Sequence, residues 1–258
     1  MNLELEDKIV LITGSGQGLG KGIAEAFLKE KAKAVITDIN EDRLNSTLDE
    51  LKVKYDAENI FTFCGNLIKQ NDISNCVNSV VKKFGRIDIL VANLGSGKGT
   101  TDWNISEDDW NTLFDINFTG ARRIVNEVLP TMIENKSGSI VFISSIAGIE
   151  VIGAPIHYSV AKAAIIAFSK NLARRIARNN IRVNTICPGN IFFENGTWDY
   201  KIKENKEKVL AMLESTVPQN RFANPEEIAN LVLFISSNTM SFMTGSCLVI
   251  DGGQTLTI

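Results

Sequence analysis

The sequence predicts an α/β fold, a doubly wound parallel sheet of about seven strands with helices on both faces. Two observations carry this prediction: short β-branched runs alternate with amphipathic stretches, and a glycine-rich string directly follows the first run. The 258 residues are 44% hydrophobic and 22% charged, which suits one large domain better than two small ones. We therefore expect a single domain over residues 1–258.

The elements are expected in strict alternation along the chain. The strand candidates are 8–12, 34–37, 60–63, 87–92, 139–143, 181–186 and 247–250. The helical patterns are 18–31, 41–54, 70–84, 106–134, 159–179 and 225–236, and Asn40 and Ser106 precede acidic first turns as caps. Segment 190–224 shows no strand signal, and a loop of that length in a compact domain is usually functional. We expect it to form a substrate lid.

Charge and composition exclude several classes of function. The net charge is −3 and like charges do not cluster, so we expect no nucleic-acid partner. The single histidine, His157, excludes a His-rich metal site, and we expect no metal. The four cysteines form no C-x-x-C pair and are expected to be reduced core thiols of a cytoplasmic protein. The start is acidic without a signal-peptide core, and no apolar run is long enough for a membrane.

The string TGSGQGLG at residues 13–20 is the clearest functional signal. It joins the apolar run 9–12 to a helical pattern, so glycines can turn the chain sharply and approach a pyrophosphate at a helix N-terminus. This layout predicts a Rossmann-like dinucleotide site. Asp38 follows the second strand at the distance where an acid accepts hydrogen bonds from ribose hydroxyls and repels a 2′-phosphate. We therefore expect NAD(H) in preference to NADP(H); a helix-capping acid is the alternative.

Tyr158 and Lys162 lie four residues apart and share one face of the expected helix. A nearby ammonium contributes up to ~4 kcal/mol at an effective dielectric of ~20, enough to lower the pKa of the phenol by two to three units. Tyr158 would then be a usable proton carrier. Ser145 follows the strand 139–143, at the end where open sheets place ligands, and its hydroxyl can donate to a substrate carbonyl.

The spacing G-x-x-x-G-x-G resembles that of the short-chain dehydrogenase/reductase family, and the resemblance extends over essentially the whole chain. In length and motif order the sequence looks like the 3-oxoacyl-acyl-carrier-protein reductases of that family. The other marks are Ala92–Gly95, Asn117, Ser144-Ser145, the YSVAK string at 158–162, Pro188-Gly189, Thr244-Gly245 and Asp251–Gly253.

The resemblance implies an NAD(P)-dependent oxidoreductase that interconverts a secondary alcohol and a ketone by hydride transfer. Tyr158 would be the general acid/base and Ser145 would orient the oxygen. Lys162 would hold the nicotinamide ribose, and Asn117 would position Lys162 through a water. A homotetramer is also implied. The expected cofactor-binding residues are Gly14, Gly16, Gln17, Gly18, Leu19, Gly20, Asp38, Asn66, Leu67, Asn93, Gly95, Tyr158, Lys162, Pro188, Gly189 and Ile191.

Three positions depart from the family pattern. Ala92–Gly95 stands where the family often has Asn-Asn-Ala-Gly, so Asn93 and Gly95 remain but one amide partner is lost. Asn66 replaces an aspartate that holds adenine, and Phe193 replaces a threonine that bonds the carboxamide. None of these changes removes a reacting group. Phe193 instead places an aromatic ring near the expected site.

The substrate side is the least determined. Lys98, in a glycine-rich loop, could hold a phosphate or carboxylate, and Phe193 and Trp198 could stack on a sugar ring; a solvated loop and a closed lid are the alternatives. His157 is expected to be a packing or cleft-wall residue. A sugar, nucleotide sugar or other small hydroxy compound is favoured as substrate. A 3-oxoacyl-carrier thioester, with Arg122-Arg123 as carrier patch, and a non-catalytic dinucleotide sensor are the alternatives.

Overall fold

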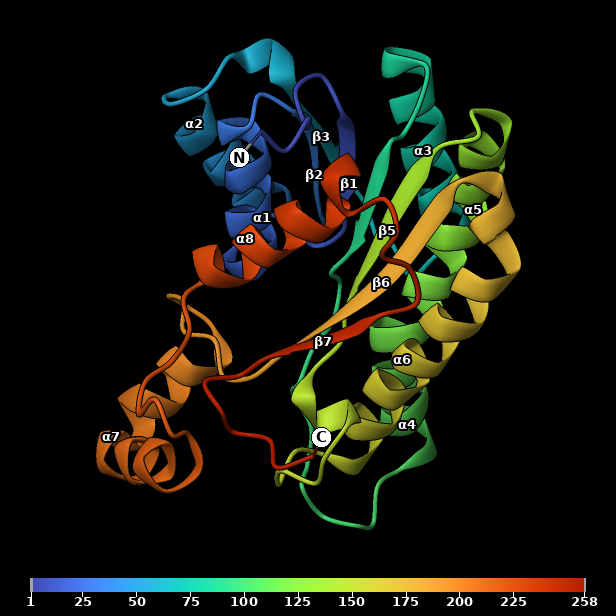
Figure 1. The fold of residues 1–258 in the computed structure, drawn as a ribbon. Helices are drawn as coiled ribbons and strands as arrows, with labels where there is room; N and C mark the ends of the chain where they lie inside the picture. Colours follow the sequence, from blue (N-terminus) through green and yellow to red (C-terminus); the bar gives the residue numbers. More distant parts are fainter. Residues whose placement is uncertain (1, 258) are drawn as a thin grey trace.

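The central strands are apolar throughout and alternate their side chains between two covered faces. In β1 (Ile9–Ile12) all four residues are buried, with Ile9 and Leu11 in one core and Val10 and Ile12 in the other. Continuous apolar runs of this kind are typical of parallel strands that are covered by helices on both sides. The sheet is therefore the middle layer of three (Figure 1).

The computed structural model describes residues 2–257 and contains one parallel sheet of seven strands in the order β3-β2-β1-β4-β5-β6-β7. Besides β1, the strands are β2 (Lys33–Asp38), β3 (Ile60–Cys64), β4 (Ile89–Ala92), β5 (Gly138–Ile143), β6 (Ile181–Pro188) and β7 (Cys247–Ile250). All seven predicted strands are present, each within two residues of its expected limits. The predicted fold class is confirmed.

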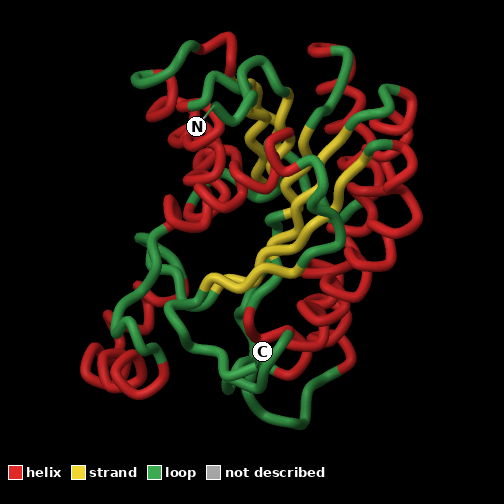
Figure 2. The backbone as a smooth tube through the Cα atoms, viewed as in Figure 1, coloured by secondary structure: helices red, strands yellow, loops and turns green. Residues whose placement is uncertain are grey.

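Helices cover both faces of the sheet (Figures 1 and 2). One core contains residues of α1 (Gly18–Lys29), α2 (Glu41–Lys52) and α8 (Pro225–Ser236). The other contains residues of α3 (Gln70–Phe84), α5 (Gly120–Glu134) and α6 (Ile156–Ile176). Two further helices, α4 (Glu107–Phe114) and α7 (Thr197–Thr216), lie toward the end of the sheet that is lowest in Figure 1.

The chain reverses its direction across the sheet between β1 and β4. Strand β1 pairs with β2 on one side and with β4 on the other, so the loops that follow β1 and β4 diverge there. Ligands of open α/β sheets bind in the crevice at the carboxyl ends of the strands beside such a reversal. The glycine string and the loops after β4, β5 and β6 all lie at this edge.

Two predicted segments differ from the structure. The helix expected over 106–134 is interrupted by a π-helical turn at Asp115–Thr119, because the Asn117 amide nitrogen donates to the Leu113 carbonyl oxygen at 3.0 Å inside the helix. Such insertions into the backbone ladder are a recognised cause of local distortion. The loop expected over 190–224 contains α7, a 20-residue helix with a kink at Asn205. Only Asp199, Val209 and Leu213 are buried in it, so its apolar periodicity is weak.

Within residues 2–257, no helix is both long enough and apolar enough to cross a membrane.

Candidate active site

The glycine string forms a tight turn that other residues could not adopt. Gly14 and Gly18 have φ values of +63° and +56°, in the left-handed region that favours glycine. A Cβ at Gly20 would lie 2.4 Å from the Gly14 carbonyl oxygen, so the helix start packs directly against the turn. The Asn93 amide donates to the carbonyl oxygens of Thr13 and Gly14, both at 3.0 Å. This rigid, side-chain-free surface at the start of α1 fits a dinucleotide pyrophosphate.

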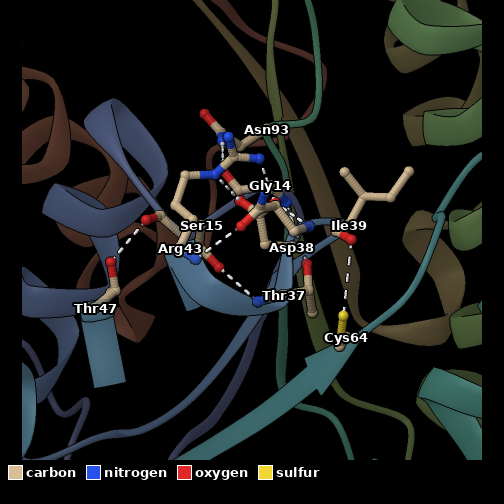
Figure 3. A network of polar contacts seen from close by, with 11 residues as sticks. Gly14, Ser15, Thr37, Asp38, Ile39, Arg43, Thr47, Cys64 and Asn93 are labelled. Carbon is tan, nitrogen blue, oxygen red and sulfur yellow. Dashed lines mark hydrogen bonds and ion pairs between the residues drawn. The ribbon is translucent and has the colours of Figure 1, made fainter. Parts of the chain in front are cut away.

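Asp38 lies beside this turn, and each oxygen of its carboxylate already has a hydrogen-bond partner (Figure 3). One oxygen accepts from the Asn40 backbone N–H at 2.8 Å and pairs with an Arg43 nitrogen, and the other accepts from Arg43 Nε at 2.9 Å. The Asp38 side chain is 6% exposed, whereas that of Arg43 is 37% exposed. The helix cap of α2 is Asn40, which accepts from the Arg43 backbone N–H, so Asp38 is not the capping residue.

Arg43 is the residue that the sequence analysis missed. A Cβ at Gly16 would lie 2.4 Å from Asp38 Oδ2, so the carboxylate and its guanidinium partner both border the glycine turn. The signal available in the sequence was an arginine five residues after Asp38, in the first turn of the next helix. The guanidinium reduces the negative field with which Asp38 would repel a 2′-phosphate.

The other expected cofactor residues gather at the same edge. Gly189 follows β6 and packs so closely that a Cβ there would lie 2.8 Å from the Asp251 Cα atom. Ile191 forms an isolated bridge to Ala223. The Phe193 ring covers Gly18, where a Cβ would lie 2.6 Å from its edge. Six further residues lie in the loops and helix starts after β1, β3 and β4, and Pro188 is the last residue of β6; the six are Gln17, Leu19, Asn66, Leu67, Asn93 and Gly95.

Tyr158 and Lys162 both belong to α6, which begins three residues earlier than predicted, at Ile156 after Pro155. The Lys162 Nζ atom lies 5.6 Å from the centroid of the Tyr158 ring, so the two side chains share one side of the helix as predicted. Lys162 is 3% exposed, and its ammonium donates to the Ile143 carbonyl oxygen at 3.0 Å. The lysine is thereby fixed against the end of β5.

The pKa of Tyr158 is shifted in the direction opposite to our expectation. Burial raises the pKa of the phenol, and a hydrogen bond with Ser145 lowers it only in part. Burial also lowers the pKa of Lys162 to about 8. Desolvation penalises the charged form of each group, and it is the largest influence on both pKa values. Tyr158 is therefore a neutral acid at pH 7, with its proton available for donation.

Ser145 and Asn117 lie close to this pair but have further partners. Ser145 Oγ accepts from the Ala147 N–H at 3.1 Å and so caps a short turn. Ser144 Oγ instead donates to the Lys162 carbonyl oxygen at 2.8 Å. The Asn117 side chain donates to the Ser96 carbonyl oxygen at 2.9 Å and accepts from its N–H at 3.1 Å. It thus ties the loop after β4 to the π-helical turn.

Gly95 separates Asn117 from Lys162. A Cβ at this glycine would lie 2.8 Å from Asn117 Oδ1 and 2.9 Å from Lys162 Nζ. The two polar atoms thus face the same small space from opposite elements. Only a residue without a side chain can occupy this position.

A large cavity of about 1190 Å³ opens in front of Tyr158 and Ser145. Lys98, Phe193 and Trp198, three of the four residues expected on the substrate side, line it. The fourth, His157, is 1% exposed and is absent from the lining; its ring packs against Trp110 with centroids 5.7 Å apart. A Cβ at Gly99 would lie 2.6 Å from the His157 ring, so His157 supports the loop that carries Lys98.

Two further expectations concern cysteines and metals. Cys76 and Cys187 are buried thiols, but Cys64 and Cys247 are exposed, which corrects the expectation of four core thiols. Both exposed residues lie in the outer strands β3 and β7, where no neighbouring strand covers them. No group of three or more His, Cys, Asp or Glu residues suited to a metal occurs in the described part of the chain.

Comparison with known proteins identifies the family. A family model described as "Enoyl-(Acyl carrier protein) reductase" matches residues 14–255. The 3-oxoacyl-[acyl-carrier-protein] reductase FabG of Thermotoga maritima is 35% identical over 254 residues, covering 97% of this chain and 99% of the relative. The structure of L-sorbose reductase from Gluconobacter frateurii, complexed with NADPH and L-sorbose, aligns with a TM-score of 0.94 at 32% identity, over 100% of both chains.

A short-chain type dehydrogenase/reductase from Mycobacterium marinum aligns with a TM-score of 0.86 at 26% identity, over 99% of this chain and 98% of the other. Together with the fold and the Tyr158–Lys162 geometry, these matches show that the chain belongs to the short-chain dehydrogenase/reductase family of NAD(P)-dependent oxidoreductases, enzymes that interconvert alcohols and ketones.

Proposed function

We propose that this enzyme reduces the ketone of a small polyhydroxy compound, such as a sugar, and catalyses the reverse oxidation of the secondary alcohol. One observation carries the proposal: Ser145 and Tyr158 line a cavity that also reaches Lys98, Trp198 and Gly189, the residue after β6. The cavity is bordered by polar and aromatic side chains. The similarity to a sugar reductase supports the same substrate class.

We propose the following roles for the site residues. The bound nicotinamide dinucleotide supplies or accepts the hydride. Tyr158 is neutral at pH 7, since burial raises its pKa above the ordinary value of 10.0, and it donates its phenolic proton to the substrate oxygen during reduction. Ser145 donates a hydrogen bond to the same oxygen and stabilises its developing charge. We assign Lys162 to the cofactor ribose and Asn117 to positioning Lys162, because Asn117 Oδ1 and Lys162 Nζ both lie close to Gly95.

We propose NAD(H) as the preferred cofactor, because Asp38 borders the glycine turn and its carboxylate is suited to ribose hydroxyls. Arg43 tempers this preference by pairing with the same carboxylate. The related L-sorbose reductase was complexed with NADPH, so the contrast between the two cofactors is a direct test.

A 3-oxoacyl-acyl-carrier-protein substrate is the second candidate, favoured by the similarity to the Thermotoga maritima reductase. The carrier patch expected at Arg122-Arg123 is weakened in the structure, because the Arg123 guanidinium donates to the Ile68 carbonyl oxygen.

Helix α7 borders the cavity through Trp198 and Tyr200, and we propose that it acts as the substrate lid.

We also propose a homotetramer. Its contact surfaces would include exposed apolar side chains: Val160 of α6 and Val249 of the edge strand β7 are each 44% exposed, and Phe242, in the segment before β7, is fully exposed. Light scattering coupled to size-exclusion chromatography tests this assembly, and a monomer in solution would contradict it.

Absorbance at 340 nm tests the reaction itself, with NADH and NADPH in parallel against ketoses, nucleotide sugars, steroids and an acetoacetyl thioester. We expect turnover with a ketose and a higher kcat/KM with NADH. Turnover of the thioester alone would favour the second candidate. Cofactor binding without turnover of any ketone would indicate a dinucleotide sensor and contradict the proposal.

A further inference from the structure

The cavity in front of Tyr158 carries positive charge that the proposed reaction does not use. Its lining includes three lysines, Lys98, Lys201 and Lys208, but only one acid, Glu204. None of the ion pairs formed among residues 2–257 involves these three lysines. Their ammonium groups are therefore available to a ligand in the cavity.

The lysines come from two walls of the cavity. Lys98 follows Gly97, where a Cβ would lie 3.8 Å from the Tyr158 ring, so this wall touches the catalytic phenol. The Lys98 Nζ atom lies 5.9 Å from the centroid of the Tyr200 ring on α7. Lys98 thus spans the distance from the reacting end of the cavity to the helix that carries the other two lysines.

The charge excess is a property of the cavity and not of α7 as a whole. The helix carries four lysines and four acids: Lys201, Lys203, Lys206, Lys208, Asp199, Glu204, Glu207 and Glu214. Lys203 is neutralised by Asp199 at 2.7 Å outside the lining, whereas the Lys201 ammonium lies 4.5 Å from the centroid of the Trp198 ring. An aromatic partner orients an ammonium without removing its charge.

The kink in α7 places its two cavity lysines on separate segments. Asn205 has non-helical φ and ψ angles of −155° and 88°, and its side chain accepts from the Lys208 backbone N–H at 2.9 Å. Asn205 therefore caps the second segment, with Lys201 before the kink and Lys208 after it. Both segments border the same cavity.

We propose that the substrate carries an anionic group, a phosphate or a carboxylate, that Lys98, Lys201 and Lys208 bind while Tyr158 faces the carbonyl. This proposal rests on the proposed ketone reduction and specifies its substrate class. Three ammonium groups with one acid attract an anion into the cavity and hold it by charge-assisted hydrogen bonds. A neutral polyol would leave them without a partner of opposite charge.

Calorimetric titration of the enzyme saturated with NAD⁺ tests the proposal without requiring turnover. The probes are matched pairs: D-fructose with D-fructose 6-phosphate, and L-sorbose with 5-keto-D-gluconate. We expect the phosphate or the carboxylate to bind at least about tenfold more tightly than its neutral partner, and the ratio to fall as salt rises. The pair with the larger ratio identifies the anion. Equal Kd values within both pairs, or no binding of either anion, would overturn the proposal.

A double variant locates the site. Lys201→Gln with Lys208→Gln is expected to weaken binding of the preferred anion about tenfold and to leave the neutral sugar within about twofold. Lys206→Gln, on the same helix but outside the lining, is the control and should change neither Kd. Unchanged anion binding in the double variant would refute the assignment. Turnover of neutral ketoses alone would leave the proposed reaction intact, so the two failures are distinguishable.

Discussion

The glycine turn and the substrate cavity lie side by side but differ in how their polar groups are satisfied. At the turn, Ser15 and Thr37 exchange hydrogen bonds at 2.7 and 2.8 Å, and Thr47 Oγ1 donates to the Gly16 carbonyl oxygen at 2.6 Å. In the cavity, neither Lys98 nor Lys201 forms an ion pair with a carboxylate of residues 2–257. The first region is shaped in advance for one ligand, whereas the second leaves its charges for the ligand to complete.

The largest effect is expected at Tyr158, which lines the substrate cavity. Tyr158→Phe removes the proton donor but keeps the ring, so we expect kcat to fall about 10³-fold, within the range for general acid catalysis. NADH binding, measured by fluorescence titration, should stay within about twofold. Tyr55→Phe, whose phenol lies near Glu25 and far from the cavity, is the matched control. A Tyr158→Phe variant that retains the wild-type kcat would show that Tyr158 is not the proton donor.

A methyl group added to the rigid region should be costly. Gly20→Ala would place a Cβ 2.4 Å from the Gly14 carbonyl oxygen and 2.7 Å from the Ser15 Cα atom, both backbone atoms that cannot rotate away. We expect the turn to shift and the Kd for NADH to rise at least about tenfold, as overpacking typically costs 1–3 kcal/mol. Gly85→Asn is the control: a Cβ at position 85 would have nothing within 4 Å, so this variant should leave the Kd for NADH unchanged. An unaltered NADH affinity in Gly20→Ala would show that the turn is not the phosphate site.

Lys162 connects the two regions at a cost in stability. Its pKa is about 8 in the folded protein and 10.5 ordinarily, so burial destabilises the native state below pH 8. The cost is relieved as pH rises from 8 to 10.5, because the unfolded chain then binds more protons than the folded one. Lys162→Met should raise the free energy of unfolding at pH 7 by up to about 3 kcal/mol, less the lost bond to Ile143, while activity falls.

Urea unfolding at pH 7 and pH 10 measures this difference. The advantage of Lys162→Met should shrink at the higher pH. Lys170→Met, on the same helix, removes a similar bond to a backbone carbonyl, that of Gly245 at 2.7 Å, but from an exposed lysine. If Lys162→Met raised the free energy of unfolding equally at both pH values, the claim that burial of the Lys162 ammonium destabilises the protein would be wrong.

The smallest expected effect concerns cofactor choice. Arg43→Ala removes the guanidinium that shields Asp38, so the Kd for NADPH should rise about fivefold while that for NADH changes less than twofold. Asp38→Asn should shift the ratio in the opposite direction. Lys54→Ala, which removes a lysine paired with Glu25, controls for net charge. Equal changes for both cofactors in Arg43→Ala would show that the ion pair plays no part in discrimination.

The sequence predicted the features that depend on backbone geometry. It did not predict those that depend on desolvation or on side-chain partners. Gly14, Gly18 and Gly20 were predictable because only glycine fits a left-handed or crowded position, and the spacing of Tyr158 and Lys162 follows from helix periodicity. The direction of the Tyr158 pKa was not predictable, because it depends on how much water the folded structure excludes.

The substrate side was least predictable for a related reason. Helix α7 buries only three of its residues, so its sequence lacks the apolar periodicity that reveals most helices. The partners of Arg43 and Asn117 are likewise set by tertiary contacts and not by local pattern. His157 was expected at a cleft wall or in packing, and its contact with Trp110 joins two separate helices.

Transfer of deuterium tests the central claim most directly, that this cavity passes a hydride to a carbonyl carbon while Tyr158 supplies the proton. The enzyme is incubated with a ketose and with NADH or NADPH that carries deuterium at both hydrogen positions of the nicotinamide C4, and the product is analysed by mass spectrometry and NMR. The account predicts an alcohol with one deuterium on the new carbinol carbon, formed at a rate that collapses in Tyr158→Phe. An unlabelled alcohol, or an equal rate in the variant, would contradict it.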